Sequence, residues 1–158
     1  MFHQLKRILI VDDAEDFRAL LSTWITLRGL RPVLAESGKQ AIEILKTNPI
    51  DLIITDFQMP EMDGLDLLKW CRSHSIHIPV VFTSASGRPV EREQVALGDC
   101  CATRLNKPIN FKILAAALDA AERHDHHRDC LHQPFKVGVE KECLVRENKE
   151  TGHEFQPD

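Results

Sequence analysis

The stretch LIITDFQMPEMDG, residues 52–64, decides the fold because a short apolar run is followed within two residues by an acidic residue and then by a turn. Residues 52–54 are continuously apolar, which is typical of a strand buried on both faces of a parallel sheet. A short apolar run followed by a polar residue also occurs earlier in ILIVDD, residues 8–13, and later in VVFTSAS, residues 80–86. We therefore expect each run to be a strand of one sheet, with the following polar residue at its carboxyl end.

Stretches with the apolar spacing of helices separate these runs. Five strands are expected, at residues 6–11, 32–34, 52–54, 80–82 and 101–105. Five helices are expected, namely after Asp13, from Ser37 to about Asn48, from about Asp63 to Cys71, around residues 89–97 with Pro89 in the first turn, and from Asn110 to about Glu122. Strict alternation of strands and helices predicts an α/β fold, a doubly wound five-stranded parallel sheet with helices on both faces.

Composition excludes several functional classes. The 158 residues are 43% hydrophobic and 28% charged, the usual balance of a globular chain with a buried core. No apolar run approaches the roughly 20 residues of a membrane span, and the opening MFHQLKRILIVDD lacks the layout of a signal peptide. The formal net charge of -4 lacks the basic excess of a DNA-binding protein. We therefore expect a cytoplasmic protein that contacts neither DNA nor a membrane.

The regular pattern ends near Arg123, which suggests a domain over residues 1–123 and a short C-terminal extension over 124–158 without an output domain. Eight acidic residues against five basic ones in the extension oppose contact with nucleic-acid phosphates. His126 and Cys130 stand four residues apart there, a spacing that matches no standard zinc motif. The sequence leaves a metal site and a polar helix end both open.

Residues with carboxylate, hydroxyl or ammonium side chains follow the predicted strands. They are Asp12, Asp13, Asp56, Thr83 and Lys107. Because the carboxyl ends of parallel strands share one edge of a sheet, these side chains should converge there. Close carboxylates repel one another unless a cation joins them, and hard carboxylate oxygens suit Mg²⁺. Positive charge beside a carboxylate nucleophile suits a transferring phosphoryl group.

Each residue alone has a simpler interpretation. Asp12 or Asp13 could cap the following helix, and Asp56 could be a turn residue. Thr83 could be an ordinary strand-end residue and Lys107 a solvated surface lysine. The common placement of all five residues at strand ends favours a shared site.

The segments ILIVDD, LIITDFQMPEMDG, VVFTSAS and LNKP together resemble the receiver domain of two-component response regulators, the CheY-like family. The resemblance covers residues 5 to about 122 and implies the strand order 2-1-3-4-5. It implies roles at six positions: phosphorylation at Asp56, Mg²⁺ binding by Asp13, Asp56 and the backbone carbonyl of Gln58, water-mediated metal contact by Asp12, and phosphoryl binding by Thr83 and Lys107. It also implies a cis Lys107–Pro108 bond.

Arg104 departs from the family pattern, which usually has a Tyr or Phe three residues before the lysine. The sequence shows no evident buried carboxylate partner for it, and burial of an unpaired charge is costly. We therefore expect Arg104 to remain largely solvent-accessible, an atypical residue at the switch position.

The resemblance implies a single-domain response regulator, not an enzyme, that receives a phosphoryl group from a histidine kinase or a phosphotransfer protein and signals to a downstream protein target. A homodimer is left open. Two alternatives remain: a phosphate-independent docking module, and an aspartyl-phosphate phosphatase of the haloacid dehalogenase type. The phosphatase family has an Asp-x-Asp motif, whereas Phe57 and Gln58 follow Asp56.

Overall fold

The computed structural model describes residues 4–123, which fold into one parallel sheet flanked by helices. The strands are β1 (Arg7–Val11), β2 (Arg31–Ala35), β3 (Leu52–Asp56), β4 (Val80–Ser84) and β5 (Ala102–Asn106). The helices are α1 (Glu15–Leu27), α2 (Gly38–Thr47), α3 (Gly64–Ser73), α4 (Glu91–Ala96) and α5 (Phe111–Arg123). The sheet order is β2-β1-β3-β4-β5, so the predicted fold class and strand order are confirmed.

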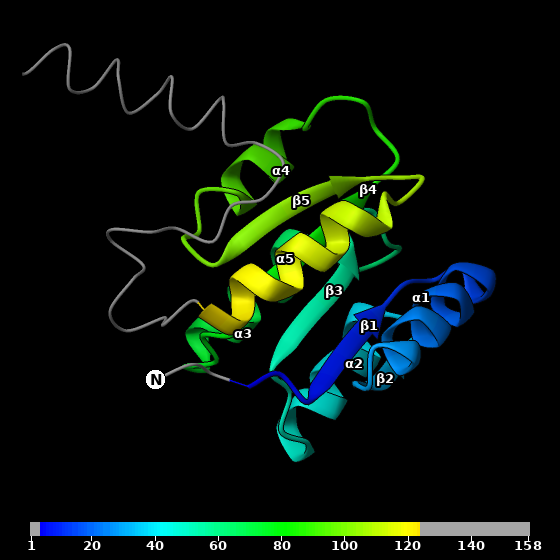
Figure 1. Ribbon diagram of the computed structural model, residues 1–158. Helices are drawn as coiled ribbons and strands as arrows, with labels where there is room; N and C mark the ends of the chain where they lie inside the picture. The colour runs from blue at the N-terminus through cyan, green and yellow to red at the C-terminus, as the bar shows by residue number, and fades with distance from the viewer. Residues whose placement is uncertain (1–3, 124–158) are drawn as a thin grey trace, which may run out of the picture.

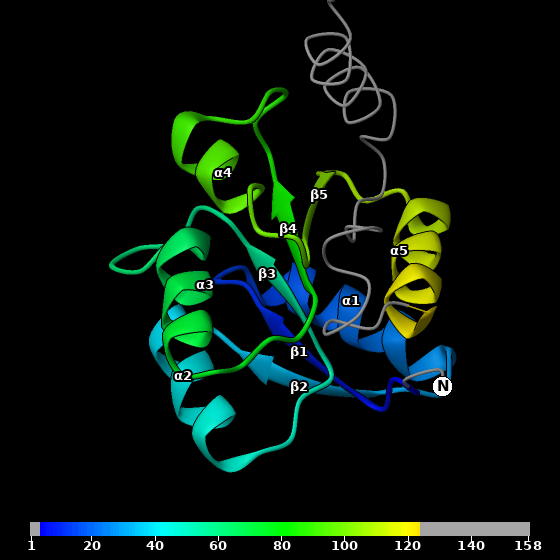
Figure 2. The same ribbon diagram turned by 90° about the vertical axis from the view of Figure 1, so that its left-hand side faces the viewer.

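The helices form two layers around the sheet. Figure 1 shows α5 in front of the strands, and Figure 2 shows α2, α3 and α4 on one side with α1 and α5 on the other. Successive strand residues alternate between two apolar clusters: Leu9 and Ile53 pack with α2 and α3, whereas Ile8 and Ile54 pack with α1 and α5. Burial on both faces explains why these strands are continuously apolar.

Local signals locate most helix ends correctly. The Ser37 side chain accepts a hydrogen bond from the Gln40 amide at the start of α2, as expected for an N-cap. Asp63 begins α3 through a capping box with Asp66. Gly29 follows α1 with a φ of 79°, a conformation that favours glycine.

The predicted bounds of several elements differ from the structure by one or two residues, including those of α4 and β5. The N-cap of α4 is Val90, so Pro89 precedes the helix and does not lie in its first turn. Strand β5 runs one residue later than expected, from Ala102 to Asn106. A proline is well suited to the extended backbone that leads into a helix, which accounts for its position.

The absence of a side chain at Gly64 allows the β3–α3 loop to pack against the core. A Cβ atom there would lie 2.9 Å from ring carbons of both Phe57 and Phe82. These two rings are buried and meet edge to face, 5.4 Å apart between centroids. Close packing of Gly64 therefore holds the segment that follows Asp56 against the sheet.

The predicted extension over 124–158, with His126 and Cys130, lies outside the described residues. Within residues 4–123, no helix has the length and apolar character needed to cross a membrane.

Candidate functional site

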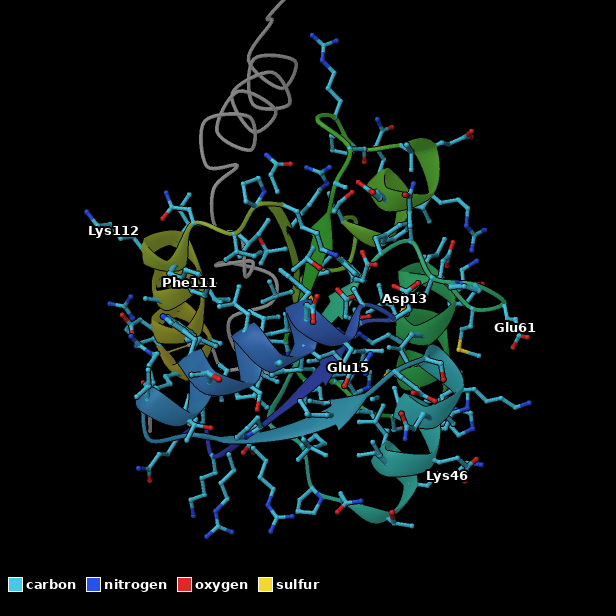
Figure 3. The ribbon with its side chains drawn as sticks, turned by 90° about the vertical axis from the view of Figure 1, so that its right-hand side faces the viewer. Asp13, Glu15, Lys46, Glu61, Phe111 and Lys112 are labelled. Atoms are coloured by element: carbon cyan, nitrogen blue, oxygen red, sulfur yellow. The ribbon has the colours of Figure 1, made fainter. Side chains whose placement is uncertain are left out.

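The five polar residues lie together at the carboxyl edge of the sheet. Asp12 and Asp13 follow β1, Asp56 ends β3, and Lys107 follows β5. Thr83 of β4 lies opposite Asp56 in the pairing of β3 with β4. Figure 3 shows Asp13 in the loop between β1 and α1. The parallel topology has joined residues that stand up to 95 positions apart in the chain.

Three carboxylates form the centre of this site. One oxygen from each of Asp12, Asp13 and Asp56 lies within 4.8 Å of the others. Asp12 and Asp56 are buried, whereas Asp13 is exposed. Hard oxygens at this spacing, open to solvent on one side, fit Mg²⁺, which keeps several water ligands.

The Lys107 ammonium supplies positive charge beside the carboxylates. Its Nζ donates to Asp12 Oδ2 at 2.9 Å and lies 3.6 Å from Asp56 Oδ1. Nζ also lies over the Phe17 ring, 4.3 Å from the centroid. The aromatic face therefore adds to the two carboxylates in favouring the ammonium at this position.

Asp12 is held by bonds at both carboxylate oxygens. Its Oδ1 accepts from the Ala14 amide at 2.8 Å, and Oδ2 accepts from Lys107. The N-cap of α1 is Ala14, with no side-chain cap bond, so neither Asp12 nor Asp13 caps the helix. The capping interpretation of these residues is wrong.

The environment of Asp56 disfavours its charged form. Burial raises the pKa of Asp56 from 3.8 to about 6, the negative charges of Asp12 and Asp13 add to the rise, and Lys107 opposes it. An additional cation at the cluster would lower this pKa again. With three carboxylates and one ammonium, the site contains more negative charge than Lys107 compensates.

This raised pKa predicts a pH-dependent stability. Between about pH 4 and pH 6 the folded state binds more protons at Asp56 than the unfolded state does, so stability falls as the pH rises through this window. Without divalent cations, Asp56→Asn is therefore expected to raise the free energy of unfolding by about 2–3 kcal/mol at neutral pH. Urea denaturation measures this difference.

At about pH 4 the wild-type carboxyl is almost fully protonated in the folded state and roughly half protonated in the unfolded state, so the two proteins should differ by less than about 1 kcal/mol. An equal difference between wild type and variant at both pH values would contradict the assigned cause.

Thr83 provides a hydroxyl that the surrounding structure does not use. Its Oγ1 is buried and, within residues 4–123, has no hydrogen-bond partner. A buried polar atom without a partner is costly. Because Thr83 is next to Asp56 across the strands, an anion attached to Asp56 could accept from this hydroxyl.

Two further expected features involve the loops. Gln58 is exposed in the loop after β3, two residues beyond Asp56. The Lys107–Pro108 bond is cis, as expected.

Arg104 does not lie in solvent, and this prediction is wrong. Only 7% of its side chain is exposed, and its Nε donates to Glu93 Oε2 at 2.7 Å. Glu93 is also buried, with a side chain 1% exposed. The cost of burying the guanidinium is offset by a buried carboxylate from α4 that the sequence did not pair with it.

Sequence reasoning missed Glu93 because helix α4 is short and weakly patterned. A usable signal was present: Glu93 stands three residues before the apolar Ala96, and both are buried on the same face of α4. A charged residue on the inward face of a helix requires a buried partner.

Comparisons with known proteins agree with this geometry. The family model for the response regulator receiver domain matches residues 8–119. The chain is 35% identical over 116 residues to the autoinducer 1 sensor kinase/phosphatase LuxN of Vibrio campbellii, covering 73% of this chain and 13% of LuxN. It is 35% identical over 129 residues to the transcriptional regulatory protein ZraR of Escherichia coli, covering 82% of this chain and 29% of ZraR. The match thus spans less than a third of either relative.

Solved structures with the same fold include two well-matched examples. CheY4 of Vibrio cholerae superimposes with a TM-score of 0.66 at 26% identity, covering 75% of this chain and 99% of CheY4. TrrA of Thermotoga maritima, solved in complex with Mg(2+)-BeF, superimposes with a TM-score of 0.63 at 26% identity, covering 73% of this chain and 97% of TrrA.

Proposed function

Because the chain belongs to the response regulator receiver domain family of two-component systems, we propose that it accepts a phosphoryl group on Asp56 and signals through protein–protein contact. One observation carries this proposal: three carboxylates, an ammonium and a buried hydroxyl meet at one edge of the sheet. Such a combination matches the charge distribution of a phosphoryl group during transfer.

The proposed reaction exchanges one bond at phosphorus. A carboxylate oxygen of Asp56 attacks the phosphorus of a phosphohistidine, the O–P bond forms as the P–N bond breaks, and the histidine nitrogen leaves with the electron pair. The Thr83 hydroxyl and the Lys107 ammonium then donate to phosphoryl oxygens. Asp56 must be ionised to attack, and a pKa of about 6 leaves most of it ionised at neutral pH.

In the proposed site, Asp13, Asp56 and the backbone carbonyl of Gln58 hold Mg²⁺, and Asp12 acts through a bound water. When bound, the ion supplies positive charge that offsets the carboxylates and the incoming phosphoryl oxygens. The fit rests on the spacing of the three carboxylates and on the raised pKa of Asp56, which burial causes and the neighbouring carboxylates increase. The relative TrrA, solved with Mg(2+)-BeF, supports the same choice of metal.

Receiver domains interact with histidine kinases or phosphotransfer proteins, and we propose such a protein as the phosphoryl donor. The proposal assigns residues 1–123 to the receiver domain, leaves 124–158 outside it, and includes a cytoplasmic location. The chain would act as a phosphoacceptor in a single-domain regulator, not as an enzyme that turns over an external substrate, and its target would be a protein.

Incubation of the full chain with Mg²⁺ and acetyl phosphate tests this function. Intact-mass spectrometry should show one added phosphoryl group per chain, labile to base and hydroxylamine, and chelation of Mg²⁺ by EDTA should prevent the addition. A chain that stays unmodified with Mg²⁺ and acetyl phosphate would refute the acceptor role and favour phosphate-independent docking.

Removal of one proposed metal ligand gives a second test. Asp13→Asn should weaken Mg²⁺ binding by more than about tenfold, since even changes outside the direct ligand set commonly cost that much. Isothermal titration calorimetry measures the affinity, and Asp16→Asn, in the exposed first turn of α1, is the matched control. Equal affinity in the Asp13 and Asp16 variants would exclude Asp13 as a ligand.

A further inference from the structure

Helix α4 is attached to the sheet by a buried ion pair. Glu93, on its inward face, binds Arg104 of β5 through Oε2 and Nε at 2.7 Å. Figures 1 and 2 show α4 beside the β4–β5 end of the sheet. The helix has only six residues, and Glu93 and Ala96 are its only buried side chains. A single ion pair therefore contributes a large part of the contact between α4 and the sheet.

The pair is satisfied by groups from three segments. Glu93 Oε1 accepts from the Ser84 hydroxyl at 2.7 Å. Arg104 donates through Nη1 to Asn106 Oδ1 at 2.5 Å and through Nη2 to the Ser86 carbonyl. A buried ion pair is tolerated when further hydrogen bonds satisfy its remaining atoms, as here. The network joins the end of β4, the following loop, α4 and β5.

This network adjoins the proposed phosphoryl site at two points. Ser84 is next in the chain to Thr83, and Asn106 is next to Lys107. The Lys107 amide also donates to the Ser84 carbonyl at 2.8 Å. Movement of either phosphoryl-binding residue would therefore displace an atom that hydrogen-bonds within the ion-pair network.

We propose that the Glu93–Arg104 ion pair is a latch that holds α4 on the β4–β5 edge and that phosphorylation of Asp56 releases it through Ser84. The release rests on the phosphoacceptor function proposed above. A phosphoryl group on Asp56 gives the partnerless Thr83 hydroxyl an acceptor and draws this strand end toward β3.

Ser84 moves with Thr83, so its 2.7 Å bond to Glu93 is lost. The nearest remaining hydroxyl, Ser86 Oγ, stands 3.4 Å from Glu93 Oε1. A buried carboxylate oxygen without a good donor is unfavourable, so α4 separates from the sheet and admits water.

Hydrogen exchange of the α4 backbone amides tests the latch in the unphosphorylated protein. Glu93→Gln should accelerate exchange by about tenfold or more relative to wild type, as local opening becomes easier. Glu91→Gln, the same change at an exposed position of α4, should stay within about twofold of wild type. Equal protection of α4 in both variants would overturn the proposal, provided that β1 amides show both proteins folded.

A second variant tests whether phosphorylation acts on α4 through the ion pair, and it is expected to fold even if Glu93→Gln does not. Glu93→Leu/Arg104→Leu removes both charges, and apolar replacement of a whole buried pair is commonly tolerated. In wild type, phosphorylation by acetyl phosphate should accelerate α4 exchange several-fold. The double variant should show no such acceleration in chains that carry the phosphoryl group.

Two outcomes would refute the release of α4 by phosphorylation. One is unchanged α4 exchange in phosphorylated wild type, and the other is equal acceleration in the phosphorylated double variant. Failure of every chain to take up phosphoryl would instead refute the proposed function. In that case the comparison of Glu93→Gln with Glu91→Gln still tests whether the ion pair holds α4 on the sheet, because that comparison needs no phosphorylation.

Discussion

A chain carrying Asp56→Asn is expected to take up no base-labile phosphoryl group from acetyl phosphate in the presence of Mg²⁺. The carboxamide lacks the ionised oxygen that attacks phosphorus. Neighbouring Asp12 is a poor substitute because both its carboxylate oxygens already accept hydrogen bonds, from Ala14 and Lys107. Intact-mass spectrometry before and after hydroxylamine treatment measures the loss.

The matched control is Glu61→Gln, which removes an acidic group from the same β3–α3 loop. Glu61 is exposed and points away from the carboxylate cluster (Figure 3). This variant should accept one phosphoryl group as wild type does. A labile group that persists in Asp56→Asn would place the acceptor elsewhere, with the exposed Asp13 as the next residue to change.

Arg104→Ala is expected to lower the free energy of unfolding by about 3–5 kcal/mol, the usual effect of removing one partner from a buried ion pair. The change leaves the Glu93 carboxylate, with a side chain 1% exposed, without its cationic partner and bonded to the Ser84 hydroxyl. Urea denaturation followed by circular dichroism measures the loss.

Arg92→Ala on the same helix is the control for this stability effect. Arg92 binds Asp63 at 2.6 Å, but half of its side chain is exposed, and an exposed ion pair contributes far less to stability than a buried one. Similar losses for the two arginine variants would show that the Glu93–Arg104 pair contributes no more than a surface pair. Recovery of stability in Glu93→Leu/Arg104→Leu would identify the unpaired buried charge as the cause of the loss.

The sequence was informative where a local pattern has a single structural outcome. Apolar runs such as residues 8–11 and 52–54 predict strands buried on both faces, and the structure confirms them. Caps at Ser37 and Gly29 mark helix ends because they satisfy backbone groups within a few residues. The convergence of the polar residues followed from topology alone, since parallel strands share one carboxyl edge.

Only the tertiary structure decided which charged side chains are buried and which are paired. Ionic interactions depend on separation and burial, and neither can be read from spacing when partners come from different elements. Arg104 of β5 is buried because helix α4 places Glu93 beside it. Glu93 stands eleven residues before Arg104 in the chain. The same reasoning applies to Asp56, whose raised pKa reflects burial and two neighbouring carboxylates. The sequence by itself determined the parallel sheet and the types of polar residue at its carboxyl edge, and the family resemblance gave the strand order. Folding determined which charged side chains are paired and which remain uncompensated.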